Sequence, residues 1–175
     1  MYDIRDKSMY ILLEAIYSEM SKQEHLEAMF KDPLTGAYNR RAFELITEPE
    51  DYVAIIDLDS LKYFNDAVQY GHRVGDALLQ HLVNIIKSTG LEVFRLGGSS
   101  DEFAVCNKDN KLLLHLLLNE ARALFPGFSF GIGKDLAEAD KNLYKNKQSR
   151  EKNGARSPRG IAPPWLFMVE LDKIA

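Results

Sequence analysis

Two carboxylates, Asp57 and Asp59, end a short apolar run and have Leu58 between them. The run is residues 52–56, Tyr-Val-Ala-Ile-Ile, and apolar side chains at consecutive positions predict a central strand that is buried on both faces. Carboxylates at the end of such a strand lie where an apolar core meets solvent. Mg²⁺ is often held by one or two carboxylates together with substrate phosphates. A pair of acids that only ends the strand and caps the next helix is the alternative.

A second acidic pair, Asp101 and Glu102, follows a turn that is rich in glycine and serine. The turn is residues 97–100, Gly-Gly-Ser-Ser. Glycine lets a backbone come close to a phosphate, and we expect the strand that begins here to neighbour the strand that ends at Asp57. Asp57 and one of the two acids would then share a cation. A solvated hairpin turn needs the same residue types, and the spacing alone favours that alternative.

Two further polar segments suit a nucleotide. In the first, over 62–76, the amide of Asn65 and the carboxylate of Asp76 can together recognise the edge of guanine, because an amide donates and accepts while a carboxylate accepts from N–H groups. The alternative is a polar loop that leads into a helix. The second segment is basic, and one or two of its residues could hold a triphosphate. For most of them the favoured explanation is that cations suit a helix C-terminus. Its members are Lys141, Lys145, Lys147, Arg150, Lys152, Arg156 and Arg159.

The elements that must position these residues follow from apolar periodicity and from turn residues. We predict strands over 52–57, 91–96, 101–106 and 128–132, and helices over 74–87, 110–125 and 135–147. The order strand, helix, strand, strand, helix, strand is the split β-α-β pattern of a ferredoxin-like sheet. The fold class is therefore α+β, an antiparallel-containing sheet with flanking helices, which we expect on one face.

The two ends of the chain carry separate expectations. Residues 1–31 predict one long amphipathic helix, which either packs on its own domain or serves to dimerise or to relay a signal. Residues 32–150 form the predicted domain, and 151–175 are a linker followed by an apolar tail. The tail, 165–169, Trp-Leu-Phe-Met-Val, would add a strand, dock on the domain or bind a partner.

The composition excludes several classes of protein. Of the 175 residues, 46% are hydrophobic and 27% charged, which is typical of a globular domain and not of a disordered chain. The net charge of −4 argues against nucleic-acid binding, and one cysteine allows no internal disulfide. No segment approaches the roughly 20 apolar residues of a membrane span, and the N-terminus lacks a secretory signal. We expect a cytoplasmic protein with no nucleic-acid partner.

Taken together, these segments resemble the GGDEF family of diguanylate cyclases over roughly residues 30–150. Residues 32–43, Asp-Pro-Leu-Thr-Gly-Ala-Tyr-Asn-Arg-Arg-Ala-Phe, resemble the opening motif D-x-L-T-G-x-x-N-R-R-x-F. Residues 95–103, Arg-Leu-Gly-Gly-Ser-Ser-Asp-Glu-Phe, resemble the signature R-x-G-G-D-E-F. The segments 57–62, 65–76 and 129–147 match further motifs in the same order, which is the specific part of the resemblance.

The resemblance implies a compact, stand-alone cyclase that condenses two GTP into cyclic di-GMP and releases pyrophosphate. Each subunit of a homodimer would hold one GTP, and the cofactor would be Mg²⁺ or Mn²⁺. The metal would be held by Asp57, Asp101 and Glu102 together with the Leu58 carbonyl. The resemblance also implies catalytic roles for Asp101, Glu102 and Lys62. Substrate would be bound by Asn65 and Asp76 at guanine and by Lys62, Lys147, Gly97 and Gly98 at the phosphates.

One departure from the family pattern leaves the activity open. Ser99 and Ser100 are inserted between the glycines and the acids. If the strand that begins at Asp101 keeps its register, the acids stay in place, whereas a shifted register would put serines at the metal. A degenerate member that binds nucleotide or protein without turnover is therefore the first alternative. A related cyclase that uses ATP or mixed nucleotides is the second, and a protein partner could bind residues 1–31 or the tail.

Overall fold

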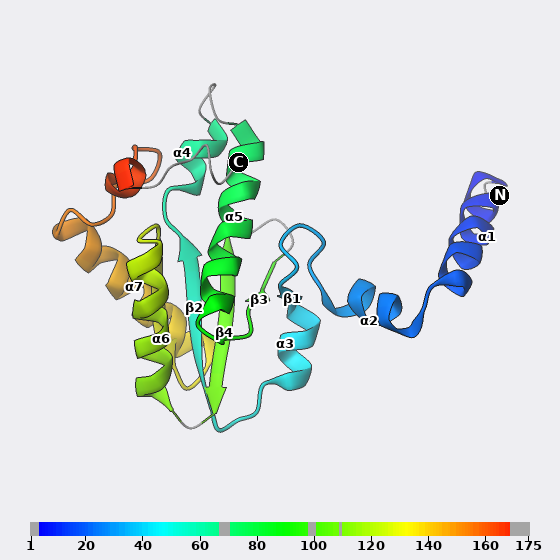
Figure 1. The fold of residues 1–175 in the computed structure, drawn as a ribbon, viewed down its shortest axis with the longest axis horizontal. Coiled ribbons are helices and arrows are strands. Elements are labelled where there is room, and N and C mark those ends of the chain that lie inside the picture. The colour runs from blue at the N-terminus through cyan, green and yellow to red at the C-terminus, as the bar shows by residue number, and fades with distance from the viewer. Residues whose placement is uncertain (1–3, 67–70, 98–100, 109, 169–175) are drawn as a thin grey trace.

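The computed structural model describes residues 4–66, 71–97, 101–108 and 110–168. Its five-stranded sheet has the order β1-β3-β4-β2-β5 (Figure 1). The strands are β1 (Tyr38–Asn39), β2 (Asp51–Leu58), β3 (Phe94–Arg95), β4 (Glu102–Lys108) and β5 (Phe128–Gly133). The helices are α1 (Ile4–Glu19), α2 (Lys22–Phe30), α3 (Arg40–Ile46), α4 (Leu61–Asp66), α5 (Gly71–Ser88), α6 (Lys111–Leu124), α7 (Leu136–Lys152) and the 3₁₀ helix η1 (Pro164–Met168).

The predicted α+β class and the split β-α-β core are confirmed. β2 pairs antiparallel with β4 on one side and with β5 on the other, and β3 pairs antiparallel with β4. The short β1, which the sequence did not predict, pairs parallel with β3 at the edge. The predicted strands 52–57, 101–106 and 128–132 begin within two residues of the observed starts of β2, β4 and β5. The predicted strand 91–96 is shorter in the structure, because only Phe94 and Arg95 pair with β4.

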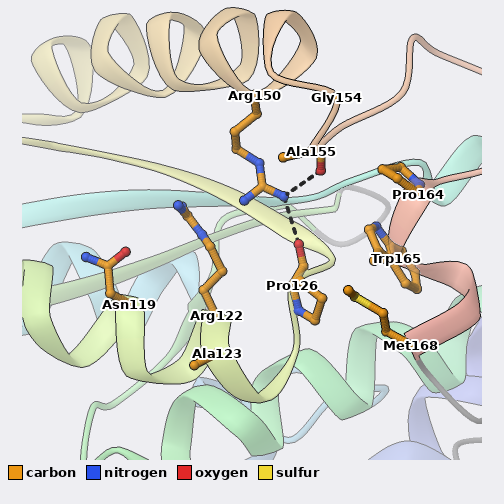
Figure 2. Close-up of a pocket in the computed structure, with 10 residues that line it drawn as sticks. All are labelled: Asn119, Arg122, Ala123, Pro126, Arg150, Gly154, Ala155, Pro164, Trp165 and Met168. Atoms are coloured by element: carbon orange, nitrogen blue, oxygen red, sulfur yellow. Dashed lines mark hydrogen bonds between the residues drawn. The ribbon is translucent and has the colours of Figure 1, made fainter.

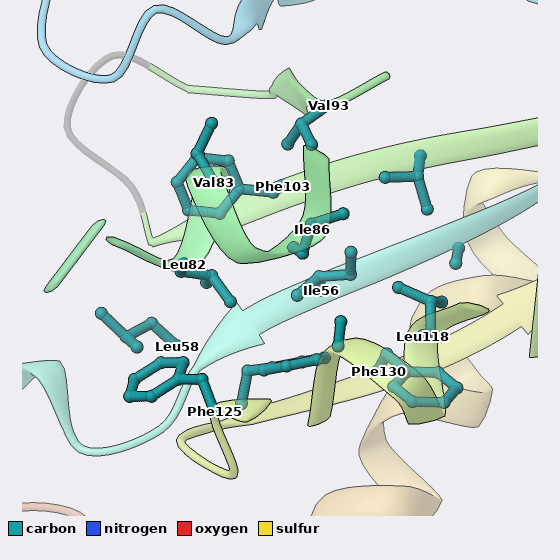
Figure 3. Packing of buried hydrophobic residues seen from close by; sticks show 14 of the residues in the cluster. Ile56, Leu58, Leu82, Val83, Ile86, Val93, Phe103, Leu118, Phe125 and Phe130 are labelled. Atoms are coloured by element: carbon teal, nitrogen blue, oxygen red, sulfur yellow. The ribbon is translucent and has the colours of Figure 1, made fainter. Parts of the chain in front are cut away.

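Helices cover both faces of the sheet, so the expectation of helices on one face was wrong. Ile56 and Leu58 of β2 belong to a cluster with residues of α5 and α6 (Figure 3). On the opposite face Ile55 packs against α7, and Val53 packs against α3. The physical reason is the apolar run itself: a strand whose two faces are apolar must be covered on both.

Glycines allow α7 to lie directly on β5. A Cβ atom added at Gly131 would come 1.9 Å from the backbone nitrogen of Leu143 and 2.3 Å from the carbonyl oxygen of Ala139. Gly133 is equally close to the backbone of α7, at 2.4 Å from the nitrogen of Ala139. This contact brings the C-terminal half of α7, with its basic residues, to the end of β2 where the acids lie.

The N-terminal segment differs from the expected single helix. Residue Ser21 separates α1 from α2, because its hydroxyl accepts from the backbone N–H of Glu24 while its own N–H donates to the Glu24 carboxylate. This capping box begins a new helix. Figure 1 shows α1 extending away from the sheet, and its large apolar side chains between 9 and 17 are more than half exposed.

The C-terminal tail docks on the domain. Trp165 is 2% exposed, and its ring lies 5.5 Å from that of Phe64 and 5.2 Å from that of Phe125. Of the three roles considered for this tail, the described part therefore packs on the core. α7 continues to Lys152, five residues beyond its predicted end, so the connection to the tail is shorter than expected. In the part of the chain that the structure describes, no helix is long and apolar enough to cross a membrane.

Replacing Gly131 with Ala tests the close packing of α7 on β5. The added methyl group meets helix backbone that cannot move alone, and overpacking of this kind costs about 1–3 kcal/mol. We expect the urea midpoint of Gly131→Ala to fall accordingly. The control is Asp140→Ala on the exposed side of α7, which should change stability by less than about 0.5 kcal/mol. Equal midpoints for the two variants would show that α7 does not depend on this contact.

Candidate functional site

A cavity of about 280 Å³ lies at the end of β2, where the first acidic pair was predicted to lie. It collects oxygen ligands and cations from three parts of the chain: the β2–α4 junction, the start of β4, and α7 with the segment after it. Its lining residues are Asp57, Ser60, Leu61, Lys62, Asp101, Lys147, Arg156, Ser157 and Arg159. Two carboxylates and four cationic side chains thus face one space, which is an arrangement suited to a metal ion with phosphates.

Asp57 is the buried carboxylate of this cavity. Its side chain is 12% exposed, and its Oδ2 atom lies 2.7 Å from the Nζ atom of Lys147. The pKa of Asp57 is raised to about 6, mainly because burial disfavours the charged carboxylate. Lys147 opposes this shift by stabilising the charged form, and the nearby Asp101 carboxylate adds to it. A carboxylate that is costly to ionise without a cation nearby is suited to binding one.

Asp59 faces a different environment, although it lies two residues away. It is fully buried, and it accepts hydrogen bonds from Ser129 Oγ (2.9 Å), Arg150 Nη2 (3.1 Å) and Arg156 Nε (2.8 Å). Its own N–H donates to the carbonyl oxygen of Gly127. Asp59 therefore has a structural role, and of the two acids only Asp57 lines the cavity.

Asp101 shares the cavity with Asp57, as the sequence predicted, but Glu102 does not line it. Glu102 lies opposite Asp57 in the strand register and its side chain is exposed. The N–H of Leu58 donates to the Asp101 carbonyl oxygen at 3.4 Å, which ties the end of β2 to the start of β4. Phe103 is fully buried beside Ile56. In this register Glu102 lies opposite Asp57, and Asp101 precedes it at the start of β4.

Of the two predicted glycines, Gly97 does not line this cavity. Gly97 lines a separate cavity of about 200 Å³ together with Asp32 and Arg95. There Arg95 Nη1 lies 3.0 Å from Asp32 Oδ1 in a buried ion pair that joins the opening motif to the hairpin. Gly98, with Ser99 and Ser100, lies outside the described residues.

Asn65 and Asp76 lie close to one another in the fold but outside the cavity lining. The Oδ1 atom of Asn65 is buried without a hydrogen-bond partner among the described residues, and a Cβ atom at Gly75 would lie 2.0 Å from it. Asp76 follows Gly75 in α5 and is exposed. The two residues predicted to recognise guanine thus lie on the neighbouring helices α4 and α5. Lys62, which does line the cavity, pairs with Asp66 at 2.9 Å.

The sequence did not predict that Arg156 and Arg159 line the cavity. Both belong to the basic run, for which a helix terminus was the favoured explanation, but they lie beyond the end of α7 and line the cavity. Ser60 was also missed, although it combines a positive φ of 66° with a buried hydroxyl that has no partner among the described residues. No sequence signal identifies a serine that adopts this strained backbone.

The residues of the cavity fit a hard divalent cation. Asp57 and Asp101 supply carboxylates, and the Ser60 hydroxyl, which has no partner within the described ranges, supplies a further oxygen. Among the residues that the structure describes, no three His, Cys, Asp or Glu side chains gather into a ready metal cluster. Two carboxylates match Mg²⁺, which usually keeps waters and takes its remaining ligands from substrate phosphates.

The profile of the family described as "Diguanylate cyclase, GGDEF domain" matches residues 29–121, which is more than half of the chain. The chain belongs to the GGDEF family. Diguanylate cyclase DgcM of Escherichia coli (strain K12) is 37% identical over 114 residues, covering 57% of this chain and 27% of DgcM. Diguanylate cyclase DgcS of Shewanella oneidensis is 31% identical over 172 residues, covering 79% of this chain and 56% of DgcS. The GGDEF chain thus spans only part of the length of these relatives.

Solved structures agree with the GGDEF fold. The isolated GGDEF domain of YfiN from Pseudomonas aeruginosa superposes with a TM-score of 0.57 at 25% identity, covering 68% of this chain and 89% of that domain. Diguanylate cyclase SiaD of Pseudomonas aeruginosa, solved with its activator SiaC, gives a TM-score of 0.59 at 24% identity, with 83% and 70% covered. The likeness to SiaD supports the fold alone.

Asparagine variants of the two neighbouring acids should lose very different amounts of stability. Asp59→Asn leaves two largely buried guanidinium groups without their carboxylate, and breaking a buried ion pair costs about 3–5 kcal/mol. Asp57→Asn frees Lys147, which is 24% exposed and can be hydrated, so the loss should be much smaller. Urea unfolding near neutral pH measures both. A change below about 1 kcal/mol for Asp59→Asn would contradict its structural role.

The raised pKa of Asp57 predicts a pH dependence with a definite sign. Between its ordinary pKa of 3.8 and about 6, the folded carboxyl binds more protons than the unfolded one. The contribution of this group to the free energy of unfolding must therefore fall as pH rises through that window. From about pH 4.5 to about pH 7.5, in the presence of a chelator, the native protein should lose about 2 kcal/mol relative to Asp57→Asn. A constant difference between the two proteins at both pH values would contradict the burial of a charged Asp57.

Proposed function

We propose that this GGDEF protein is a diguanylate cyclase that condenses two GTP into cyclic di-GMP and releases pyrophosphate. The observation that carries the proposal is the shared cavity of Asp57 and Asp101, with Lys62, Lys147, Arg156 and Arg159 around it. It supplies acids for a metal and cations for a triphosphate at one place. The relatives named diguanylate cyclases support the same reaction.

In the proposed reaction the 3′-hydroxyl of each GTP attacks the α-phosphorus of the other. Two phosphodiester bonds form, the two bonds to pyrophosphate break, and two pyrophosphates and the two hydroxyl protons are released. Asp57 and Asp101 would hold the metal with the Leu58 carbonyl, and Lys147 would move from Asp57 to a phosphate. When bound, Mg²⁺ or Mn²⁺ would stabilise the attacking and leaving oxygens. Lys62, Arg156 and Arg159 would bind the remaining phosphate charge. Glu102, which is exposed beside Asp57, would take part only after a rotation of its side chain.

Asn65 and Asp76 would select guanine. The buried oxygen of Asn65, which has no hydrogen-bond partner among the described residues, offers an acceptor, and the exposed carboxylate of Asp76 on the adjacent helix offers another. Guanine presents N–H donors at its Watson–Crick edge, which two acceptors can bind. This choice favours GTP over ATP as the substrate.

The reaction requires two nucleotides, so we propose a homodimer in which each subunit contributes one GTP. The dimer would bring the two reactants together and so reduce the entropic cost of their encounter. The exposed apolar residues of α1 support either a dimerising or a signal-relaying role for the N-terminal segment. A protein partner could bind the same segment, and we place the protein in the cytoplasm, where GTP is found.

A second function, nucleotide binding without turnover, is favoured by two observations. The Asp57 carboxylate is already paired with Lys147, and the Glu102 side chain is exposed and does not line the cavity. Such a degenerate GGDEF domain would keep the phosphate-binding cations while failing to hold the metal. It would then act as a nucleotide sensor or through a protein partner.

Incubation of the purified protein with GTP and Mg²⁺ or Mn²⁺, with products read by mass, separates these functions. We expect cyclic di-GMP from the native protein and at least about a hundredfold less from Asp57→Asn, because the variant cannot supply the metal-binding charge. Asp140→Asn, which changes an exposed acid on α7 outside the cavity lining, is the matched control and should remain active.

The other outcomes are equally informative. No product at high protein concentration, from protein shown to be folded and dimeric, would contradict the cyclase. GTP binding in that case would support the degenerate alternative. A cyclic product from ATP in a competition assay would overturn the role of Asn65 and Asp76.

A further inference from the structure

A second cavity, of about 430 Å³, lies between α6, the end of α7 and η1 (Figure 2). Its volume falls within the range of small-molecule sites. Apolar groups form much of its wall, among them Pro126, Trp165 and Met168. Two arginines, Arg122 from α6 and Arg150 from α7, reach into it, and Figure 2 shows their side chains extending toward each other from the two helices.

Unpartnered hydrogen-bond donors concentrate at this cavity. Among the described residues, five buried side-chain nitrogen or oxygen atoms have no partner, and three of them belong to residues that line it. They are Nε of Arg122, Nε of Arg150 and Nε1 of Trp165. Arg150 and Trp165 are 8% and 2% exposed. All three atoms are donors, and burying a donor without an acceptor is costly, so a ligand that suits this cavity supplies acceptors.

The charges around the cavity are also unbalanced. Arg150 and Arg156 share the Asp59 carboxylate, and Arg156 also pairs with Glu151. Among the described residues, no carboxylate oxygen lies within 4.0 Å of the guanidinium group of Arg122. That group instead lies 4.2 Å from the centre of the Phe130 ring and donates to Asn146 at 3.4 Å. Three guanidinium groups thus face two carboxylates, and one positive charge is left over.

We propose that this cavity binds a small molecule that carries a single carboxylate on an apolar body. The carboxylate would accept from Arg122 and Arg150, since a planar guanidinium group matches a carboxylate in charge and geometry. The apolar body would lie against Pro126, Trp165 and Met168. A single carboxylate balances the one excess charge, whereas a phosphate dianion would add an uncompensated charge between apolar walls.

This site is separate from the cavity of Asp57. Arg150 lines one cavity and Arg156 the other, and the buried Asp59 carboxylate lies between the two guanidinium groups. Binding here does not depend on the proposed cyclase activity, so a test by direct binding leaves that proposal untouched.

The probe is 3-phenylpropionate, titrated into the full chain and followed by calorimetry or by NMR shifts, with 3-phenylpropionamide as its neutral counterpart. We expect saturable binding with a Kd of about 1 mM or tighter. The amide should bind at least about tenfold more weakly, because it lacks the charge that Arg122 requires.

Two variants and two matched controls locate the site. Arg122→Gln removes the excess charge, and Ala123→Phe fills the cavity from an exposed position on α6; each should weaken binding of the acid at least about tenfold. Lys145→Gln removes an exposed charge from α7, and Leu124→Phe adds a ring beside Ala123 at a residue that does not line the cavity. Both controls should bind the acid as the native protein does.

Three results would overturn the proposal. They are an absence of saturable binding of the acid up to about 10 mM, equal affinity for the acid and the amide, and unchanged affinity in both Arg122→Gln and Ala123→Phe. Far-UV circular dichroism of each variant excludes unfolding as the cause of a loss.

Discussion

The buried carboxylate of Asp59 is the interaction on which the geometry of the GGDEF domain's functional end depends. It accepts from Ser129 in β5, from Arg150 in α7 and from Arg156 in the segment that follows α7, while its N–H is bonded to Gly127. Removing a carboxylate and two guanidinium groups from water is costly, and several good hydrogen bonds are needed to offset that cost. Asp59 therefore holds four separate parts of the chain at one point.

The cavity of Asp57 is arranged around this point. Lys147 lies three residues before Arg150 on α7, so the ion pair of Arg150 also fixes the turn of helix that brings Lys147 to Asp57. Arg156 is held by Asp59 from the other side and forms part of the cavity lining. Asp57 and Asp59 thus have different roles. Asp59 accepts several hydrogen bonds and is structural, whereas Asp57 has a raised pKa and is paired with Lys147 alone.

The sheet supplies the rigid frame for this arrangement. β2 lies between β4 and β5, and its apolar faces are covered from both sides, so the acids at its end extend from a well-packed element. The glycine at position 131 allows α7 to approach β5 at backbone distance. At the edge, the buried pair of Asp32 and Arg95 holds the hairpin that leads to Asp101. Precision of this kind is what sites on strands offer over sites on loops.

The sequence by itself determined β2, β4 and β5, the helices α5, α6 and α7, and the split β-α-β order, because apolar periodicity and turn residues are local signals. It also predicted that Asp57 and Asp59 lie at the end of β2. The family resemblance further predicted a shared site for Asp57, Asp101, Lys62 and Lys147, and these four residues line one cavity in the structure. Only the tertiary structure decided that Asp59 is buried with two arginines, that Glu102 does not line the cavity and that the tail docks through Trp165. Those outcomes depend on contacts between residues far apart in the chain, such as Asp59 with Arg156. Composition and sequence spacing do not indicate which distant residue pairs with a buried charge.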